Sequence, residues 1–446
     1  MNLINALRLN KQNKNLVISI VGAGGKTTAL FQLARQIQSQ VKGRKSQVVV
    51  TTTTHLAPWQ IKFADYHIVP KNIDDLKNMP ADGIILITGD GNDKKVNAPN
   101  SETLIWLRAY CQEKNIPLLI EADGSRQRPI KSPAEHEPPI PEFSDFVIYV
   151  LGLSCIGKQL NNENVHRPEI FSQLTKLELN QNITPESIIK TLTHPQGGLK
   201  NIPSHSKRIV LLNQADTPEL KSIGGDMAKK LLNHFDSVVV GSLQQDDFQT
   251  FEKTAGVILA AGDATRFGSP KQLLDWKGKP FVRHIAETAL HADLQPVLVI
   301  TGNHHAEIES CLQDLPVEVI HNPQYKNGQS ESIKLGIKNL PDNIGANIFL
   351  LADQPQIPVE VIQALKEKHT QTLSPIIAPL ILEERRANPV LFDKVTFDDL
   401  LQLTGDVGGR AIFDKHKVDY LPWHDDILIF DVDTKEDYAR LKGLDV

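Results

Sequence analysis

Residues 259–271 read Leu-Ala-Ala-Gly-Asp-Ala-Thr-Arg-Phe-Gly-Ser-Pro-Lys and follow an apolar run at 256–260. The apolar run predicts a buried strand, and the small residues after it allow backbone N–H groups to approach a triphosphate. Arg266 and Lys271 could neutralise the charge that develops on departing pyrophosphate. The alternative is a glycine-containing turn with two solvated cations, but the longer pattern after a strand favours a nucleotide cradle. We expect Leu259, Ala260, Ala261 and Gly262 to contact the nucleotide.

Short Val-, Ile- and Leu-rich runs alternate with helical patterns along the rest of the chain, and this alternation predicts an α/β protein. Ser242–Thr254 is polar and lacks a periodic pattern, so we expect a linker there. The sequence therefore predicts two Rossmann-like three-layer domains, at 1–245 and 254–446. The apolar runs predict strands at 16–21, 48–52, 84–88, 118–122, 146–151, 209–213, 256–260, 297–301, 317–321, 348–353 and 376–380.

Composition narrows the functional class. The chain has 446 residues, 40% of them hydrophobic and 23% charged, with a formal net charge of -5. That balance argues against a nucleic-acid-binding surface, which usually needs a dominant positive face. Three widely spaced cysteines support neither a disulfide framework nor a structural zinc site. No apolar run reaches the roughly 18 residues of a membrane span, so we expect a cytoplasmic protein with no membrane partner.

Two aspartates are candidate metal ligands in the second half. Asp353 ends an apolar strand, at the edge where open α/β sheets bind ligands, and a carboxylate there can hold magnesium. Asp433 is the expected second carboxylate. An alternative role for Asp433 is equally plausible from the sequence, because Thr434 to Asp437 looks like a helix N-cap box and the preceding Asp could favour the helix dipole. We expect Mg²⁺ to be the cofactor.

A glycine-rich loop at 405–410 suggests where an acceptor binds. Asp406 and Arg410 lie in this loop and suit an anionic acceptor, although its glycines could simply mark turns. The acceptor phosphate would attack the α-phosphorus in line, while Arg266 and Lys271 stabilise the leaving group. An acceptor phosphate is already ionised near neutral pH, so this chemistry needs no Ser/His/Asp arrangement.

Several blocks in the second half resemble the molybdenum cofactor nucleotidyltransferases, most closely the cytidylyltransferase (MocA-like) branch. This resemblance implies a nucleotide-diphospho-sugar transferase-like fold and the transfer of CMP from CTP to molybdopterin, with Ser330 binding nucleotide and Asn388 binding acceptor. Ala261 stands where guanylyltransferase relatives carry Gly, which favours CTP over GTP. GTP, or a sugar phosphate as acceptor, is the alternative, and Arg385–Pro389 departs from the usual family wording. The matching blocks are residues 259–274, 321–333, 353–355, 388–392, 405–410 and 431–434.

Residues 21–28, Val-Gly-Ala-Gly-Gly-Lys-Thr-Thr, lie between a predicted strand and an amphipathic helix, as a phosphate-binding loop does. Lys26 would reach phosphates and Thr27 would offer its hydroxyl to magnesium. The loop is a variant, because Ile20 stands where the standard pattern has its first Gly, and a plain helix-initiating turn is the alternative. Asp123, after another strand, is the expected carboxylate partner of the metal. The residues predicted to bind nucleotide in this P-loop-NTPase-like domain are Gly22, Gly24, Gly25, Lys26, Thr27, Thr28, Asp123, Asn213 and Asp216.

Asn213 and Asp216 have the spacing of the Asn-Lys-x-Asp motif that reads guanine, but Gln214 replaces the Lys. A strand-end Asx turn explains the pair nearly as well. His55 and His136 stand beside hydroxyls or carboxylates, where a histidine is more often a hydrogen-bonded loop residue than a metal ligand.

Residues 16–241 resemble the YqeC family, with Glu121–Pro141 the most specific stretch. The resemblance implies an accessory role for selenium-dependent molybdenum hydroxylases, and hence a client hydroxylase as partner. Two interpretations remain open for this half. It either binds or hydrolyses a nucleotide to prepare or deliver cofactor, or it is a non-catalytic docking module that retains nucleotide affinity.

Overall fold

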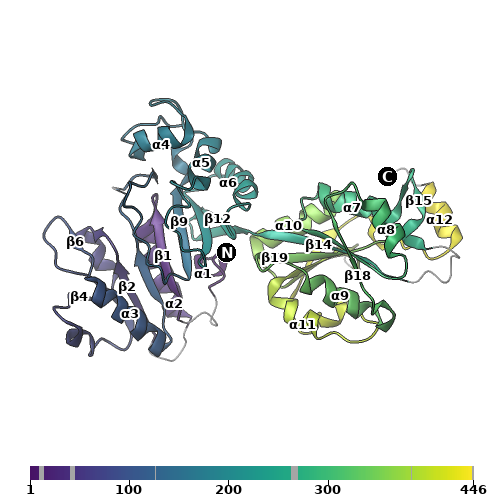
Figure 1. The fold of residues 1–446 in the computed structure, drawn as a ribbon, viewed down its shortest axis with the longest axis horizontal. Helices are drawn as coiled ribbons and strands as arrows, with labels where there is room; N and C mark the ends of the chain where they lie inside the picture. Colours follow the sequence, from purple (N-terminus) through teal and green to yellow (C-terminus); the bar gives the residue numbers. More distant parts are fainter. Residues whose placement is uncertain (10–14, 41–45, 126, 263–269, 383, 444–446) are drawn as a thin grey trace. The chain divides into compact units, whose positions relative to one another are not determined.

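The computed structural model describes residues 1–9, 15–40, 46–125, 127–262, 270–382 and 384–443. The chain divides into two compact units, unit 1 at Met1–Phe251 and unit 2 at Glu252–Val446. Both are α/β, coloured purple to teal and green to yellow in Figure 1. Arg266 lies outside the described residues. No helix among those residues is long and apolar enough to cross a membrane.

Unit 1 is built on a nine-stranded sheet whose neighbouring strands run parallel, apart from one antiparallel edge strand. Parallel strands covered on both faces require continuous apolar runs, which is the pattern these segments carry. In spatial order the strands are β13 (Asp247–Phe251), β12 (Ser237–Ser242), β11 (Lys207–Asn213), β9 (Phe146–Gly152), β1 (Val17–Gly22), β7 (Leu118–Glu121), β2 (Gln47–Thr52), β5 (Gly83–Ile87) and β4 (Tyr66–Ile68).

Alternation of side chains along these strands creates two separate cores. On β1, Ile18 and Ile20 face the core that holds α1 (Leu3–Ala6) and α2 (Lys26–Ser39), whereas Val17 and Val21 face the opposite core. The unit therefore has three layers. The helices contributing to the second core are α3 (Ser101–Lys114), α4 (Pro168–Thr175), α5 (Pro185–Thr193) and α6 (Pro218–Leu231).

Helix starts in unit 1 follow capping chemistry. The side chains of Asn100, Thr184 and Thr217 accept hydrogen bonds from backbone N–H groups in the first turns of α3, α5 and α6. Pro185 and Pro218 follow two of these caps, where a missing N–H costs nothing. Local sequence thus fixes where the covering helices begin.

The boundary between the units, at Phe251/Glu252, falls inside the segment expected to be a linker, but this segment contains regular structure. β13 pairs antiparallel with β12 as an edge strand of unit 1, and Lys253 already begins a strand of unit 2. β13 has alternating burial rather than a continuous apolar run, so a search for apolar runs overlooks it. The Thr250 hydroxyl donates to the Ala6 carbonyl at 2.8 Å, joining this last strand to the first helix.

Unit 2 has a mixed sheet. In order its strands are β18 (Glu318–His321), β17 (Val297–Thr301), β14 (Lys253–Ala260), β19 (Ile344–Leu351), β22 (Val390–Asp393), β20 (Ile376–Ile381) and β21 (Arg385–Arg386), while β23 (Val418–Trp423) also pairs with β20. β22 runs antiparallel to both neighbours. β14 directs Ile258 to the core containing α7 (Phe281–His291), α8 (His305–Leu312) and α10 (Val359–Thr372), and Val257 to the core containing α9 (Gln329–Lys338) and α11 (Phe397–Leu401).

Short elements complete both units. Two-stranded pairs form between β3 (His55–Leu56) and β6 (Val96–Asn97), between β8 (Ile130–Lys131) and β10 (Val165–His166), and between β15 (Asp275–Trp276) and β16 (Lys279–Pro280). A 3₁₀ helix, η1 (Pro58–Phe63), follows β3, and α12 (Lys435–Lys442) lies near the end of the described chain.

Candidate functional sites

The turn between β1 and α2 is a tight glycine-dependent loop. Gly24 and Gly25 have φ angles of +74° and +129°, in the left-handed region that favours glycine. A Cβ on Gly24 would lie 2.3 Å from the Gly152 nitrogen and 2.5 Å from the Pro129 oxygen, so no larger residue fits without moving the backbone. The predicted phosphate loop is therefore packed against the end of β9.

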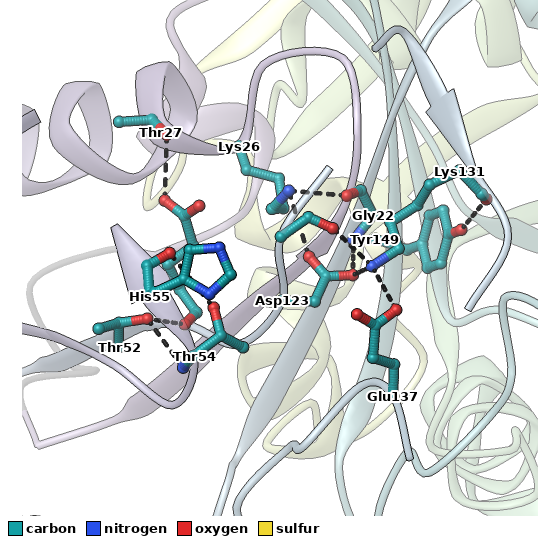
Figure 2. Close-up of polar contacts among 12 residues, drawn as sticks. Gly22, Lys26, Thr27, Thr52, Thr54, His55, Asp123, Lys131, Glu137 and Tyr149 are labelled. Atoms are coloured by element: carbon teal, nitrogen blue, oxygen red, sulfur yellow. Dashed lines mark hydrogen bonds and ion pairs between the residues drawn. The ribbon is translucent and has the colours of Figure 1, made fainter. Parts of the chain in front are cut away.

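Lys26 is 4% exposed and faces Asp123. Its Nζ donates to the Gly22 carbonyl at 2.8 Å and lies 3.2 Å from Asp123 Oδ1. The other carboxylate oxygen of Asp123 accepts from the Gly22 N–H at 3.0 Å and lies 3.0 Å from Lys131 Nζ (Figure 2). Asp123 thus holds two lysines and the start of the loop together.

The ionic network continues away from the loop through Glu137. Lys131 Nζ is 2.9 Å from Glu137 Oε2, and Arg167 donates to both oxygens of Glu137 at 2.6 and 3.0 Å. Burial opposes ionisation of Glu137, but the hydrogen bonds from Arg167 and the charge of Lys131 outweigh it and lower its pKa to about 2. Sequence reasoning did not assign Lys131, Glu137 or Arg167 to a site. Lys131 and Glu137 lie in the stretch that resembles the YqeC family, but only the fold brings Arg167, 30 positions beyond Glu137, to their side.

The carboxylate beside Thr27 is Glu121, whereas the sequence predicted Asp123 for that role. Thr27 Oγ1 donates to Glu121 Oε2 at 3.1 Å and accepts from Gln60 Nε2. Burial raises the pKa of Glu121, and the charge of Lys26 and the Thr27 hydrogen bond oppose that rise. Glu121 ends β7, directly beside β1, while Asp123 lies beyond the strand and is occupied by two lysines.

The residues predicted to read a base lie at the end of β11. Asn213 Nδ2 donates to the Gly24 carbonyl at 2.7 Å and its Oδ1 accepts from Leu243 N–H at 2.9 Å, so both ends of this amide brace the loop. Asp216 is exposed, and its backbone oxygen accepts from Gln245 at 3.3 Å. Gln214 Oε1 accepts from Ser154 at 2.6 Å. Base reading by Asn213 and Asp216 stays a prediction.

A cavity of about 700 Å³, which we call the N-terminal cavity, opens over this loop. Gln214 follows β11, the phosphate loop follows β1, Glu121 ends β7 and Thr53 follows β2, so the cavity lies at the carboxyl edge of the sheet. The residues that border it include Gly24, Gly25, Lys26, Thr27, Thr28, Thr53, Thr54, His55, Trp59, Gln60, Glu121, Arg128, His136, Glu137, His166, Arg167 and Gln214.

Unit 2 contains a cavity of about 690 Å³, the nucleotide cavity, at the ends of β14 and β19. Of the predicted cradle residues, Leu259, Ala261 and Gly262 line it, together with Lys271 and Asp353. Ala260 and Ser330 are buried and do not line it. Gln272 and Ser332, which sequence reasoning missed, do line it; Gln272 donates to the Gly262 carbonyl at 2.8 Å and so fixes the loop.

Acidic residues surround Lys271 beside this cavity. Lys271 Nζ lies 2.7 Å from Asp433 Oδ1. Burial raises the pKa of Asp353, the charge of Lys271 opposes the rise, and Asp431 and Asp433 add to it. Asp431, also missed from the sequence, accepts from Gln354 at 2.7 Å. Among the described side chains, no group of three His, Cys, Asp or Glu residues is arranged to hold a metal ion.

The segment after Asp433 forms the helix N-cap box that the sequence suggested. Thr434 caps α12, its side chain accepting from Asp437 N–H at 3.1 Å while Asp437 accepts from Thr434 N–H at 2.9 Å. Asp433 itself is 63% exposed at its side chain and pairs with Lys271. The capping box and the ion pair therefore use different residues, and Asp433 as a metal ligand stays a prediction.

A smaller cavity of about 290 Å³ shares Leu259, Gln329 and Leu351 with the nucleotide cavity, and we call it the acceptor cavity after the residues predicted to bind the acceptor. Asn388 and Arg410 line it, and Arg410 Nη2 donates to Asn388 Oδ1 at 3.2 Å. Burial and the neighbouring Arg386 lower the pKa of Arg410.

Asp406, which is predicted to bind the acceptor, borders the larger of the two cavities. Its acceptor role stays a prediction. Its Oδ1 accepts from the Gln329 N–H at 3.1 Å, and the residue borders the nucleotide cavity rather than the acceptor cavity. Asp406 therefore holds the start of α9, where Gln329 separates the two cavities.

Two family models match the chain: "YqeC protein" over residues 18–169 and "MobA-like NTP transferase domain" over residues 256–420. The chain is 33% identical over 244 residues to the uncharacterized protein YqeC of Escherichia coli K12, a match covering 53% of this chain and 91% of the relative.

Two further relatives match the second unit. A probable molybdenum cofactor guanylyltransferase of Bacillus cereus strain Q1 is 33% identical over 140 residues, covering 31% of this chain and 66% of that protein. The purine catabolism protein PucB of Bacillus subtilis strain 168 is 28% identical over 206 residues, covering 42% of this chain and 95% of the relative.

Proposed function

The chain belongs to the YqeC family in its first unit and joins to it a MobA-like NTP transferase domain, and on that premise we propose that it matures a molybdenum cofactor. The second unit is a nucleotidyltransferase. In this proposal the second unit transfers CMP from CTP to molybdopterin and releases pyrophosphate. The first unit binds a nucleotide and serves a client molybdenum hydroxylase. We expect that client to be selenium-dependent.

The adjacency of two cavities supports the transfer reaction most directly. Lys271 and Lys326 border the nucleotide cavity and Arg410 borders the acceptor cavity, with Gln329 in the shared wall. A nucleotide and an anionic acceptor can therefore meet without a covalent enzyme intermediate. This arrangement supplies proximity and orientation, which account for much of the rate in two-substrate reactions.

In the proposed mechanism the acceptor phosphate attacks the α-phosphorus, and the bond from that phosphorus to the pyrophosphate oxygen breaks. Lys271 stabilises the charge that develops on pyrophosphate, and Arg266 is expected to assist from a segment outside the described residues. Asn388 orients Arg410, so that the guanidinium is held in place for the acceptor. Ala261 and Gly262 have little side-chain bulk and leave their backbone accessible to the nucleoside.

Magnesium fits the acidic side of the nucleotide cavity. Asp353 and Asp406 border the cavity. Asp431 and Asp433 lie close enough to Asp353 to raise its pKa, an unfavourable charge arrangement that a divalent cation would relieve. Mg²⁺ prefers one or two carboxylates plus phosphate oxygens, so Asp353, with Asp433 as second ligand, would hold it. When bound, the ion would neutralise phosphate charge.

The experiment that tests this proposal incubates the full chain with molybdopterin, Mg²⁺ and either CTP or GTP, and identifies dinucleotide and pyrophosphate by mass spectrometry. We expect product from CTP, on the basis of Ala261. The Bacillus guanylyltransferase relative favours GTP as the second candidate. Product from GTP alone would reverse the base assignment, and an absence of product from either nucleotide would contradict the proposed acceptor.

For unit 1 we propose nucleotide binding at the Gly22–Thr28 loop, with Glu121 in place of Asp123 as the carboxylate beside the Thr27 hydroxyl. A bound triphosphate would draw Lys26 away from Asp123, and Lys131 would remain to neutralise that carboxylate. Nucleotide hydrolysis that disappears in Lys26→Ala would support turnover. Binding without hydrolysis would instead favour the docking-module interpretation.

A further inference from the structure

The N-terminal cavity extends to both sides of the phosphate loop. Gln214 follows β11, on one side of β1, and Trp59 lies on η1, which follows β2 and β3 on the other side. The sheet order between them is β11-β9-β1-β7-β2, and these four strand spacings amount to about 19 Å. A nucleotide anchored by its phosphates at the central loop can place its nucleoside on one side only.

Thr27 indicates which side the terminal phosphate would face. Its hydroxyl contacts Glu121 at the end of β7 and Gln60 on η1, so the hydroxyl end of the loop points toward β7 and β2. The nucleoside would then extend the opposite way, toward Gln214. The Trp59 side is left for a second molecule next to the terminal phosphate.

The Trp59 side is built to hold a flat molecule. Trp59 borders the cavity, and 46% of its surface is exposed. Its ring makes an edge contact with the ring of Phe63, with centroids 5.9 Å apart. Phe63 in turn packs on Phe31 of α2 with centroids 5.5 Å apart. Gln60, only 5% exposed, ties the same 3₁₀ helix to Thr27. The indole is therefore supported by Phe63 on one side and borders the cavity.

Hydrogen-bonding groups lie beside this platform. Thr53, Thr54 and His55 border the cavity after β2. Their loop is fixed because Thr52 Oγ1 donates to the Glu121 carbonyl at 2.8 Å and accepts from Thr54 N–H at 3.1 Å (Figure 2). A flat ring with polar edges matches an aromatic face flanked by hydroxyls and an imidazole.

We propose that the N-terminal cavity binds a pterin-type heterocycle on Trp59 at the same time as a nucleotide on the phosphate loop. The choice of a pterin rests on the proposed function, in which unit 2 acts on a pterin. The first unit then has a two-ligand site, in which the terminal phosphate of the nucleotide faces the second ligand and not only water.

The test uses the full chain and 6-hydroxymethylpterin as probe, with tryptophan fluorescence as readout. We expect the probe to quench emission from Trp59, both alone and with a saturating non-hydrolysable nucleoside triphosphate. Trp59→Leu should lose that quenching and weaken binding about tenfold, the usual cost of removing one stacking ring, while Trp59→Phe retains most of the affinity. Calorimetry should count one pterin site fewer in Trp59→Leu, since unit 2 keeps its own.

Trp106→Leu is the matched control, because Trp106 stacks on Tyr110 with centroids 5.1 Å apart and does not border the cavity. It should leave the Trp59 quenching intact. Two results would overturn the inference. In the first, nucleotide displaces the probe and Trp59→Leu loses nucleotide affinity, which would mean that Trp59 stacks on a nucleobase. In the second, the probe causes no quenching that depends on Trp59. Failure of the proposed nucleotide site is seen separately, as nucleotide binding that Lys26→Ala does not change.

Discussion

The charged residues at the candidate sites of the two units differ in burial. In unit 1, the side chains of Lys131 and Asp123 are 1% and 2% exposed and are paired with each other. In unit 2, Lys271 and its partner Asp433 are 17% and 63% exposed beside an open cavity. The charged groups of the first site are paired with one another within the protein. Those of the second site are expected to complete their interactions only when substrates bind. The comparison separates residues that stabilise the fold from residues that contact substrates, and four predictions test it.

The largest expected effect is on the stability of unit 1. Asp123→Asn removes the anion between Lys26 and Lys131 and leaves buried charge unpaired, a change that typically costs about 3–5 kcal/mol. Urea denaturation measures the free energy of unfolding. Asp226→Asn, in an exposed pair with Lys229, is the control and should cost about 1 kcal/mol or less. Equal losses of unfolding free energy in both variants would contradict the distinction between buried and exposed ion pairs.

Lys271→Ala and Asp353→Ala should each lower transferase turnover by about 10²–10³-fold, because each removes a group that acts on developing charge or on the metal. The midpoint of urea unfolding should change little, since both residues border a cavity. Product formation under saturating substrates measures the effect. Lys338→Ala, an exposed lysine on α9, is the control. Near-normal turnover in both variants would refute the site assignment.

Acid should destabilise unit 1 through Glu137. Its pKa of about 2 in the folded protein lies below the ordinary 4.5, so its contribution is present above pH 4.5 and is lost as pH falls from there toward 2. The contribution is on the order of 3 kcal/mol. Glu137→Gln should therefore be less stable than the parent at pH 7, with the difference shrinking by pH 3. A difference that does not depend on pH would show that the carboxylate charge is unimportant.

The smallest effect concerns the acceptor. Arg410→Ala should raise the KM for molybdopterin about tenfold and leave the KM for the nucleotide unchanged, because Arg410 borders only the smaller cavity. Asn388→Ala, which removes the group that orients Arg410, should have a weaker effect of the same kind. Steady-state kinetics with each substrate varied separately distinguishes these outcomes. An increase confined to the nucleotide KM would reverse the assignment of the two cavities.

Continuous apolar runs predicted most of the central sheet strands well. The run at 297–301 coincides with β17, because burial on both faces leaves a clear signal. Two partly buried strands, β13 and β23, were missed, because their alternating or half-exposed residues resemble loops. The fully buried β12 and β22 were missed as well, whereas the half-exposed β18 was predicted, so burial alone does not decide which strands the sequence reveals.

Site residues next to glycine loops could be predicted, but partners that the fold brings together could not. Lys271 and Asp353 border one cavity as expected. Asp123 was predicted for the role that Glu121 occupies, because strand-end position alone does not tell which carboxylate meets Thr27. Trp59, on a short 3₁₀ helix between two strands, carries no motif at all, and only the strand order places it beside the phosphate loop.

The contact between Thr250 and Ala6 has a consequence for the order of events during synthesis. The two residues are separated by 244 positions. The contact between the last strand and the first helix of unit 1 can therefore form only after almost all of that unit has left the ribosome. Chains usually fold domain by domain as they emerge, and long-range contacts form late. Because unit 2 begins at Glu252, its first strand emerges as unit 1 closes. Closure of unit 1 and nucleation of unit 2 are therefore expected to be consecutive events on the nascent chain.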